Sequence, residues 1–195
     1  MGHLVDPAQP IDPPAGGPSA PPPGRVQVWV AAGDGHAELR ELLAAATGVR
    51  AGELRIERGA HGRPELAEPA GSGIDFNLSH SHGVALVALA TGRRVGVDVE
   101  RVRQRERWPQ IAARWFSGAE QEAIAALPEG ERLAAFYAQW TVTEAWVKLT
   151  GTGLGHRGEP PAHAAVRRLA PAPGFAGAVA AEGSDWQLDL YRVAP

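Results

Sequence analysis

The sequence predicts an α+β fold built from two portions of similar size that meet near Arg94. Runs of alternating apolar residues, typical of half-buried strands, occur in both portions. Each portion also has apolar residues at helical spacing, and glycine and proline separate the segments. The 195 residues are enough for one large domain or for two small packed halves. We therefore expect an N-terminal half at 25–94 and a C-terminal half at 95–195, although no residue-level repeat relates them.

The N-terminal half is expected to follow a disordered tail. Residues 1–24 are rich in proline, glycine and alanine and have few side chains to bury. A proline-rich ligand for a partner domain is the alternative interpretation of this tail. Beyond it, the patterns predict a strand at 26–30, a helix at 37–47 ended by Gly48, a short strand at 54–56, a turn-rich stretch at 58–73 and an apolar strand at 84–90.

The C-terminal half begins with Val95-Gly96-Val97-Asp98-Val99-Glu100, whose β-branched alternation predicts a strand. Helical spacing and the breakers Pro128 and Gly130 then predict three helices, at 109–116, 118–126 and 131–149. Gly151, Gly153 and Gly155 are expected to end the third helix and form a flexible loop. The remaining strands are predicted at 165–169, 177–181 and 186–193.

Composition excludes several classes of protein and of site. The chain has no cysteine, so a disulfide framework and a thiolate metal site are impossible. The net charge of -3 argues against general nucleic-acid affinity, although Arg101, Arg103, Arg105 and Arg107 form a local basic cluster. No signal peptide and no apolar run of membrane-spanning length is present, which predicts a cytoplasmic location.

Two acidic residues on the strand at 95–100 are the first candidates for chemistry. Asp98 and Glu100 lie two apart, so their side chains point to one side of the strand, while Val97 and Val99 point to the other. Two carboxylates this close repel each other and favour a positive partner between them. A hard divalent cation such as Mg²⁺ suits their oxygen atoms. Pairing with Arg101 or Arg103 at a solvent-exposed strand end is the alternative.

The helix at 131–149 offers a second candidate group. Trp140, Glu144 and Lys148 follow at spacings of four and share one helix face. Trp140 and Trp146 indicate a substantially buried helix, where a carboxylate and an ammonium need strong partners. Glu144 can complete a metal site with the strand carboxylates, and Lys148 can contact a phosphate or a proton in transit. The alternative is an ordinary surface Glu–Lys pair.

Two further segments suit anionic ligands. Ser79-His80-Ser81-His82 supplies hydroxyl, imidazole and amide groups that fit phosphate oxygens, with zinc binding or a solvated turn as alternatives. Gly62-Arg63-Pro64 places a guanidinium on a stiff turn, where it can meet an anionic or planar group or can be a plain loop arginine.

The order of these motifs resembles the surfactin-type 4′-phosphopantetheinyl transferases. The resemblance rests on Phe76–Ser81, Gly96–Glu100, Phe116–Glu120 and Trp140–Lys148, and covers roughly residues 37 to 155. It implies a pseudo-dimer of two similar α/β halves with the active site between them. The sequence departs from the family pattern at Thr143, where relatives carry lysine. A further departure is the short Ala31–His36 segment, where relatives carry an arginine-rich stretch.

The resemblance also implies a role for each candidate residue. It makes Asp98, Glu100 and Glu144 ligands of Mg²⁺, or of Mn²⁺. Ser79 and His80 would contact the phosphates of coenzyme A, the substrate, and Arg63 its nucleotide portion. Lys148 would lie at the pyrophosphate and assist proton transfer to the leaving group, while Glu144 would accept the serine proton, directly or through water.

The activity implied is Mg²⁺-dependent transfer of 4′-phosphopantetheine from coenzyme A to a serine of an acyl or peptidyl carrier protein, with release of 3′,5′-ADP. The expected partners are therefore coenzyme A and a carrier protein, and the expected state is a monomer without nucleic acid or membrane. Two alternatives stay open: a catalytically degenerate paralogue that binds coenzyme A or a carrier protein, and a metal-dependent nuclease, against which the negative charge argues.

Overall fold

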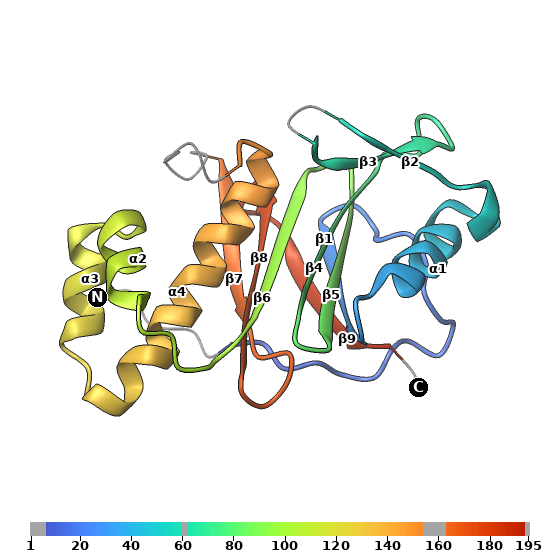
Figure 1. Cartoon of the computed structure of the whole chain (residues 1–195). Helices are drawn as coiled ribbons and strands as arrows, with labels where there is room; N and C mark the ends of the chain where they lie inside the picture. The colour runs from blue at the N-terminus through green and yellow to red at the C-terminus, as the bar shows by residue number, and fades with distance from the viewer. Residues whose placement is uncertain (1–6, 60–61, 154–162, 194–195) are drawn as a thin grey trace.

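The computed structural model describes residues 7–59, 62–153 and 163–193. Its arrangement is the α+β type expected from the sequence, in four successive layers (Figure 1). Helix α1 (His36–Thr47) covers one face of a four-stranded sheet, and helix α4 (Glu129–Thr150) covers one face of a three-stranded sheet. The two sheets pack against each other between these helices. Within the described residues, no helix combines the length and the apolar character needed to cross a bilayer.

The four-stranded sheet has the order β4-β5-β1-β9. It contains β1 (Arg25–Ala32), β4 (Ile74–Ser81), β5 (Val84–Thr91) and β9 (Gln187–Arg192). Strand β5 pairs antiparallel with both β1 and β4, whereas β9 pairs parallel with β1. Strand β9, near the C-terminal end of the described residues, therefore belongs to the same sheet as β1.

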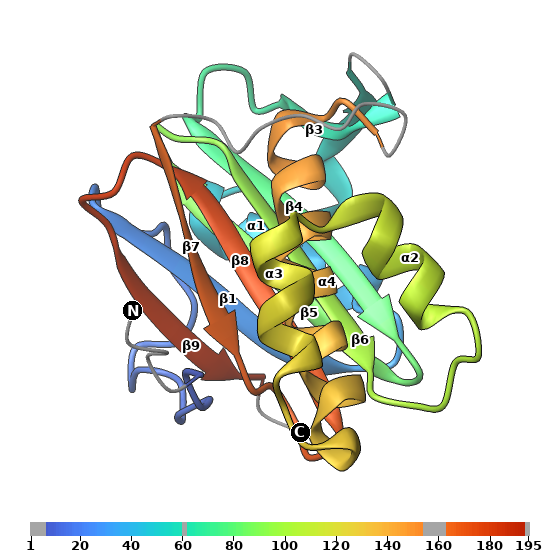
Figure 2. The same cartoon turned by 90° about the vertical axis from the view of Figure 1, so that its left-hand side faces the viewer.

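The three-stranded sheet has the order β6-β8-β7 and is antiparallel throughout. Its strands are β6 (Val95–Arg101), β7 (Ala164–Leu169) and β8 (Phe175–Glu182). Two short helices, α2 (Trp108–Trp115) and α3 (Gly118–Ala125), pack on α4, and Figure 2 shows the three helices in front of this sheet. These elements match the helices and strands predicted from the sequence.

Apolar side chains from both sheets form the central core. Val26, Val28 and Leu86 come from the four-stranded sheet, and Val97 and Val99 from β6. Each strand contributes alternate residues to this core, because side chains two apart share a face. A second apolar cluster fills the space between α1 and the first sheet, and a third joins α4 to β8.

Gly96 allows α4 to lie directly on β6. A Cβ atom at this position would overlap the carbonyl oxygen of Ala145 and the amide nitrogen of Leu149. Backbone atoms in a helix cannot move aside as a flexible side chain can. The absent side chain of Gly96 therefore fixes the distance between β6 and the helix that carries Glu144 and Lys148.

The segment at 58–73 differs from the turn-rich stretch predicted. It contains strand β3 (Pro64–Glu68), which pairs with β2 (Arg55–Arg58) in a small antiparallel sheet beyond the short 3₁₀ helix η1 (Ala51–Glu53). The proline obscures this strand in the sequence, because it is tolerated only at a strand start or edge. Here Pro64 is the first residue of β3.

Part of the tail expected to be disordered makes specific backbone contacts. The amide of Ala8 donates to the carbonyl of Arg168 at 3.1 Å, and the amide of Ile11 donates to that of Leu190 at 2.9 Å. The Thr91 hydroxyl donates to the carbonyl of Pro21 at 2.7 Å. Residues 7–24 thus lie along the two sheets, and the rest of the expected tail falls outside the described residues.

Candidate active site

Strand β6 presents its two carboxylates to α4. Val97 and Val99 enter the central core, so Asp98 and Glu100 project from the opposite face. Helix α4 packs on this face and carries Glu144 and Lys148. Residues from three separate stretches of sequence, 79–81, 98–100 and 144–148, therefore meet at the junction of β4, β6 and α4.

The ammonium of Lys148 is the positive group nearest the buried carboxylate. Its Nζ atom donates to Asp98 Oδ1 and to Ser79 Oγ, both at 2.8 Å. The hydroxyl of Ser79 donates to the same Oδ1 atom at 2.9 Å. Two side chains that are 69 residues apart in sequence thus donate to one oxygen of Asp98.

The other oxygen of Asp98 has no hydrogen-bond partner in the part of the chain that the structure describes. Asp98 is 5% exposed, and its Oδ2 atom is buried without a hydrogen bond from the described residues. Burial raises the pKa of this carboxyl group, although Lys148 and Ser79 oppose the rise. An unpartnered buried carboxylate oxygen is costly, because it has lost water without gaining a donor or a cation.

Burial and neighbouring negative charges also raise the pKa values of Glu100 and Glu144. Burial, and then the charge of Asp98, raise the pKa of Glu100, against opposition from Ser81, Arg105 and Lys148. Burial and the charges of Asp98 and Glu100 raise the pKa of Glu144 to about 7, with Lys148 and Arg105 opposing. The junction therefore concentrates three carboxyl groups that destabilise one another when all are ionised.

The residues present fit a hard divalent cation, although their side chains are not gathered around one point. Within the part of the chain that the structure describes, no group of three acidic or histidine side chains is arranged to hold a metal ion. The free Oδ2 of Asp98, with the upward pKa shifts of Glu100 and Glu144, marks where a cation would relieve both desolvation and repulsion. All donors are oxygen atoms, which is the ligand set that Mg²⁺ prefers.

A regular set of side-chain contacts joins β4 to β6, and we call it the side-chain ladder. The backbone amides of Val95, Val97, Val99 and Arg101 donate, in order, to Asp75 Oδ2 at 2.7 Å, Asn77 Oδ1 at 3.0 Å, Ser79 Oγ at 3.3 Å and Ser81 Oγ at 3.3 Å. Strand β6 is an edge strand of its sheet, so these amides have no strand partner among the described residues. Polar side chains at every second position of β4 take the place of that partner.

The ladder separates the two residues that the sequence predicts as a phosphate-binding pair. Ser79 points toward β6 as the third rung of the ladder. His80, the next residue in the strand, lies on the other side, where its ring centroid is 6.3 Å from that of His36 at the start of α1. The Ser79 hydroxyl is also buried against Asp98 and Lys148, so it is not a freely exposed group.

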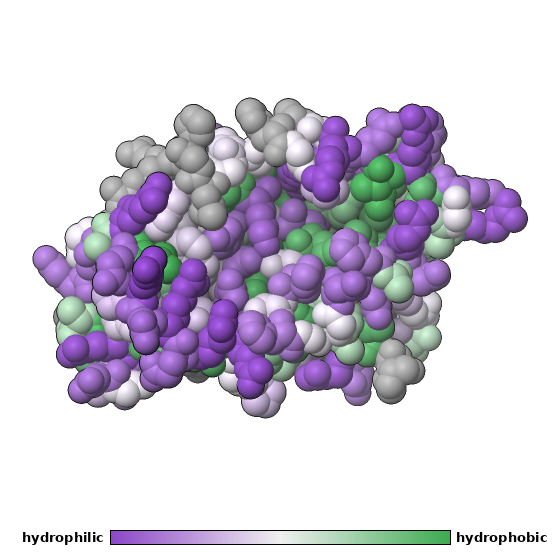
Figure 3. Space-filling view, in the orientation of Figure 1, coloured by the Kyte–Doolittle hydropathy of each residue, from purple (hydrophilic) through white to green (hydrophobic). Residues whose placement is uncertain are grey.

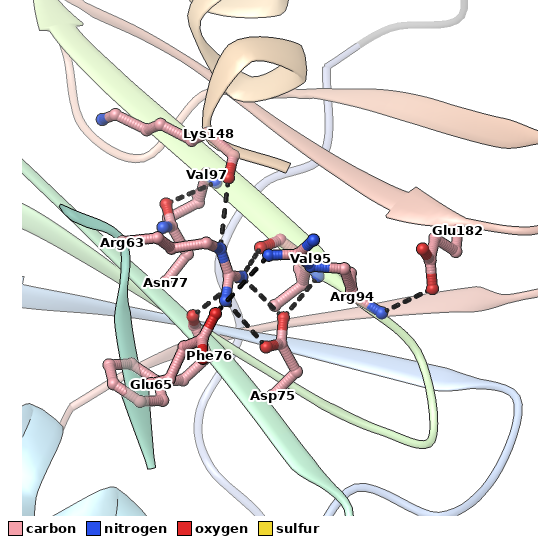
Figure 4. A network of polar contacts seen from close by, with 10 residues as sticks. All are labelled: Arg63, Glu65, Asp75, Phe76, Asn77, Arg94, Val95, Val97, Lys148 and Glu182. Atoms are coloured by element: carbon pink, nitrogen blue, oxygen red, sulfur yellow. Dashed lines mark hydrogen bonds and ion pairs between the residues drawn. The ribbon is translucent and has the colours of Figure 1, made fainter. Parts of the chain in front are cut away.

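Arg63 is held inside the protein. Its side chain is 4% exposed, and its guanidinium donates to both oxygens of Asp75, at 2.9 and 2.7 Å. It also donates to the carbonyls of Phe76, Val95 and Lys148, as Figure 4 shows. All three guanidinium nitrogens therefore serve protein acceptors, and the expected contact of Arg63 with the nucleotide stays a prediction.

Two pockets flank this junction and share Pro64, Asn77 and Leu78. One, of about 250 Å³, continues along Gly62, Arg63, Val147, Lys148, Gly151 and Gly153. The other, of about 290 Å³, continues along His36, Leu39, Ile56, Phe76 and His80. Because the two pockets share three residues, they form one continuous stretch of surface. Lys148 lines one part of it and His80 the other, although these residues come from different layers of the fold.

Asp75 and Asn77 were not among the candidate residues predicted from the sequence, although both take part in the side-chain ladder. Ser81 and Arg105 were named only as members of a phosphate-binding segment and of a basic cluster. In the structure Ser81 is a rung of the ladder, and Arg105 interacts electrostatically with Glu100 and Glu144. The alternation of polar residues from Asp75 to Ser81 was a usable signal, because it predicts one polar face of a strand. No local pattern singles out Arg105 among the neighbouring arginines.

Comparison with known proteins places the chain in a family. Residues 94–191 match the 4′-phosphopantetheinyl transferase superfamily. The 4′-phosphopantetheinyl transferase HetI of Nostoc is 33% identical over 173 residues, which cover 81% of this chain and 73% of HetI. The 4′-phosphopantetheinyl transferase AcpT of Salmonella typhimurium is 38% identical over 93 residues, 48% of this chain and 47% of AcpT.

A human relative, L-aminoadipate-semialdehyde dehydrogenase-phosphopantetheinyl transferase, is 31% identical over 130 residues, which span 62% of this chain and 42% of the relative. The matches to AcpT and to the human protein thus span less than half of those proteins. The chain belongs to the 4′-phosphopantetheinyl transferase superfamily. It is accordingly an enzyme, a 4′-phosphopantetheinyl transferase.

Proposed function

We propose that this enzyme is of the surfactin type and moves the 4′-phosphopantetheine arm of coenzyme A onto a serine of an acyl or peptidyl carrier protein. In this proposal the reaction requires Mg²⁺ and releases 3′,5′-ADP. The active site lies at the junction of β4, β6 and α4, between a half at 25–94 and a half at 95–195 that form a pseudo-dimer. Strand β9 belongs to the second half but pairs with β1 in the four-stranded sheet, and this pairing connects the two halves.

The observation that carries the proposal is the free, buried Oδ2 atom of Asp98, close to two further carboxyl groups whose pKa values are raised. A protein that only needed a stable core would gain by replacing such a group with an apolar residue. Unrelieved negative charge beside a pocket lined by Lys148 is instead what a site for a cation and a phosphate ester requires.

Asp98, Glu100 and Glu144 would hold the metal ion. Bound Mg²⁺ would supply Lewis-acid chemistry by neutralising negative charge on the pyrophosphate oxygens. A bound cation would also relieve the desolvation and the mutual repulsion of these three carboxylates. Mn²⁺ has a similar preference for oxygen ligands and would occupy the same position.

Glu144 and Lys148 would move the protons. The carrier serine oxygen forms a bond to the β-phosphorus of coenzyme A, and the bond from that phosphorus to the bridging oxygen breaks. Glu144 accepts the serine proton, directly or through water. Lys148 donates toward the departing phosphate of 3′,5′-ADP, and the rest of its role is positioning and charge stabilisation.

Coenzyme A would lie along the two adjoining pockets. Lys148 lines the first pocket, where it would contact the phosphates together with Ser79, whose hydroxyl accepts a hydrogen bond from the Lys148 ammonium. His80 lines the second pocket, where it would reach the same ligand across Asn77 and Leu78. The Gly62-Arg63-Pro64 segment would shape the nucleotide end. In this proposal Arg63 acts by holding that segment in place, since its guanidinium faces inward.

The carrier protein would approach over the loop after β6. Arg101, Arg103, Arg105 and Arg107 are all exposed there, and Figure 3 shows a largely hydrophilic surface over α2 and this loop. An acidic carrier surface would be attracted to these guanidinium groups. We further propose that the enzyme acts in the cytoplasm as a monomer, without nucleic acid or membrane.

The test is mass spectrometry of apo carrier proteins incubated with the enzyme, coenzyme A and Mg²⁺. A mass gain of one phosphopantetheine arm, lost in EDTA and lost in a folded Asp98→Ala variant, is the expected result. Tight binding of coenzyme A without any transfer to several carriers would contradict the proposal.

A further inference from the structure

The side-chain ladder repeats one arrangement at the two carboxylates of β6. Ser79 accepts the amide of Val99 at 3.3 Å and donates to the carboxylate of Asp98 at 2.9 Å. Two residues further on, Ser81 accepts the amide of Arg101 at 3.3 Å and donates to Glu100 Oε2 at 3.1 Å. Each serine thus binds a carboxylate and the backbone amide that follows it, which fixes the side chain relative to its own strand.

Ser81 is the less conspicuous of the two, because its hydroxyl does not touch Lys148. We propose that Ser81 is a positioning residue: it acts through Glu100, whose carboxylate it orients on the α4-facing side of β6 so that a divalent cation can be shared with Asp98. The inference rests on the proposed function, because it assigns Ser81 to the metal site proposed above.

The contacts of the Ser81 hydroxyl determine its direction. Ser81 is 8% exposed, and its Oγ atom lies 3.1 Å from Glu100 Oε2 and 3.1 Å from His82 Nδ1. A hydroxyl has one proton to donate and two lone pairs. When that proton goes to Glu100, the amide of Arg101 and the Nδ1–H tautomer of His82 fill the two acceptor positions. The hydroxyl is then fully used and points at the carboxylate.

Glu100 depends on this single contact. Among the described residues, Ser81 is the one hydrogen-bond partner of the Glu100 side chain. Asp98 by contrast accepts hydrogen bonds from both Ser79 and Lys148. Glu100 is also only partly buried, so packing does less to restrain it than it does for Asp98. Removal of the Ser81 hydroxyl therefore frees a proposed metal ligand that nothing else in the ladder holds.

The test measures Mn²⁺ binding to the substrate-free enzyme by electron paramagnetic resonance. Groups that orient a metal ligand commonly contribute ten- to a hundredfold to affinity, so Ser81→Ala should weaken Mn²⁺ binding about tenfold. Ser81→Cys keeps the size but has a weak donor, and should weaken binding similarly. Ser81→Thr keeps the hydroxyl and should restore most of the affinity. In turnover assays, Ser81→Ala should raise the Mg²⁺ concentration for half-maximal rate without changing KM for coenzyme A.

Asn77→Ala is the matched control, because Asn77 is a ladder rung whose side chain accepts the Val97 amide and, among the described residues, hydrogen-bonds no carboxylate. It should lower the thermal unfolding midpoint as Ser81→Ala does but leave Mn²⁺ affinity unchanged. In a Glu100→Gln background, Ser81→Ala should cause no further loss of affinity. Equal Mn²⁺ binding by wild type, Ser81→Ala and Ser81→Cys would overturn this inference alone. Failure of the wild type itself to bind Mn²⁺ would instead contradict the proposed metal site.

Discussion

The guanidinium of Arg63 forms two parallel hydrogen bonds to the carboxylate of Asp75, and its Nε atom donates to the carbonyl of Lys148 at 3.3 Å. Arg63 precedes β3, Asp75 lies on β4, and Lys148 lies in the last turn of α4 (Figure 4). Asp75 also accepts the amide of Val95 at 2.7 Å. This buried ion pair therefore connects β3 and β4 to α4 and β6, the two elements that carry the proposed metal ligands.

Breaking this pair from one side should be costly. We expect Asp75→Ala to lower the free energy of unfolding by about 3 kcal/mol, because it leaves the Arg63 charge buried and unpaired. Chemical denaturation measures this loss. Arg58→Ala, on the β2–β3 hairpin that carries Arg63, is the control, since Arg58 is exposed and its side chain donates to the Gly62 carbonyl and to no other acceptor among the described residues. It should change stability by less than about 0.5 kcal/mol, and equal losses in the two variants would contradict the role given to Asp75.

Gly96 should tolerate no side chain. Gly96→Ala places a methyl group against the backbone of α4 at Ala145 and Leu149, so the helix must shift from β6. We expect a loss of stability of about 1–3 kcal/mol together with reduced transfer activity, because Glu144 and Lys148 move with the helix. Gly130→Ala, in the first turn of the same helix and with open space around it, should stabilise the protein slightly. Unfolding curves and activity assays compare the two variants.

The raised pKa of Glu144 predicts a pH-dependent stability. Its pKa is about 7 in the folded protein against an ordinary value of 4.5. The folded state therefore binds this proton more tightly than the unfolded state does, and the resulting stabilisation is present below pH 4.5 and lost as pH rises through about 7. In EDTA, Glu144→Gln should be more stable than wild type at pH 8.5 and nearly equal to it at pH 5. A variant less stable than wild type at pH 8.5 would show that burial does not penalise this carboxylate.

Lys148 should matter more for turnover than for binding. Lys148→Met removes the ammonium that contacts Asp98 and Ser79 but keeps the length of the side chain. We expect kcat for phosphopantetheine transfer to fall about a hundredfold, which is the usual size of a lost proton donor. Steady-state kinetics with a carrier protein measure this kcat, and Lys148→Arg is the control that preserves the charge. A kcat within threefold of wild type would exclude the role in leaving-group protonation.

The exposed Arg105 should affect the pKa values of the carboxyl groups in the site. Its charge lowers the pKa of Glu144 and of Glu100, so Arg105→Gln should raise both pKa values further. If Glu144 must be ionised to accept the serine proton, the acidic limb of the pH–rate profile moves to higher pH by a few tenths of a unit. The shift should shrink at high salt, because Arg105 is exposed. Arg103→Gln serves as control and should leave the limb unchanged.

Short-range patterns were sufficient for most of the fold. The alternation at 26–30 and 95–100, the apolar run at 84–90 and the helical spacing at 37–47 and 131–149 each predicted an element that the structure contains. Strand β3 was missed because a starting proline and flanking glycines carry the signal of a turn. Alternation also placed Asp98 and Glu100 on one side of their strand, because that relation depends only on the pleat.

The sequence by itself thus determined the type of each element, the acidic face of β6 and the membership of a transferase family. Only the tertiary structure decided that Lys148 and Ser79 meet at Asp98, that β9 returns to pair with β1, and that β4 binds the edge of β6 through side chains. The reason is physical. Periodicity depends on neighbours a few residues away, whereas the choice of a distant partner depends on which packing buries the apolar faces of all layers at once.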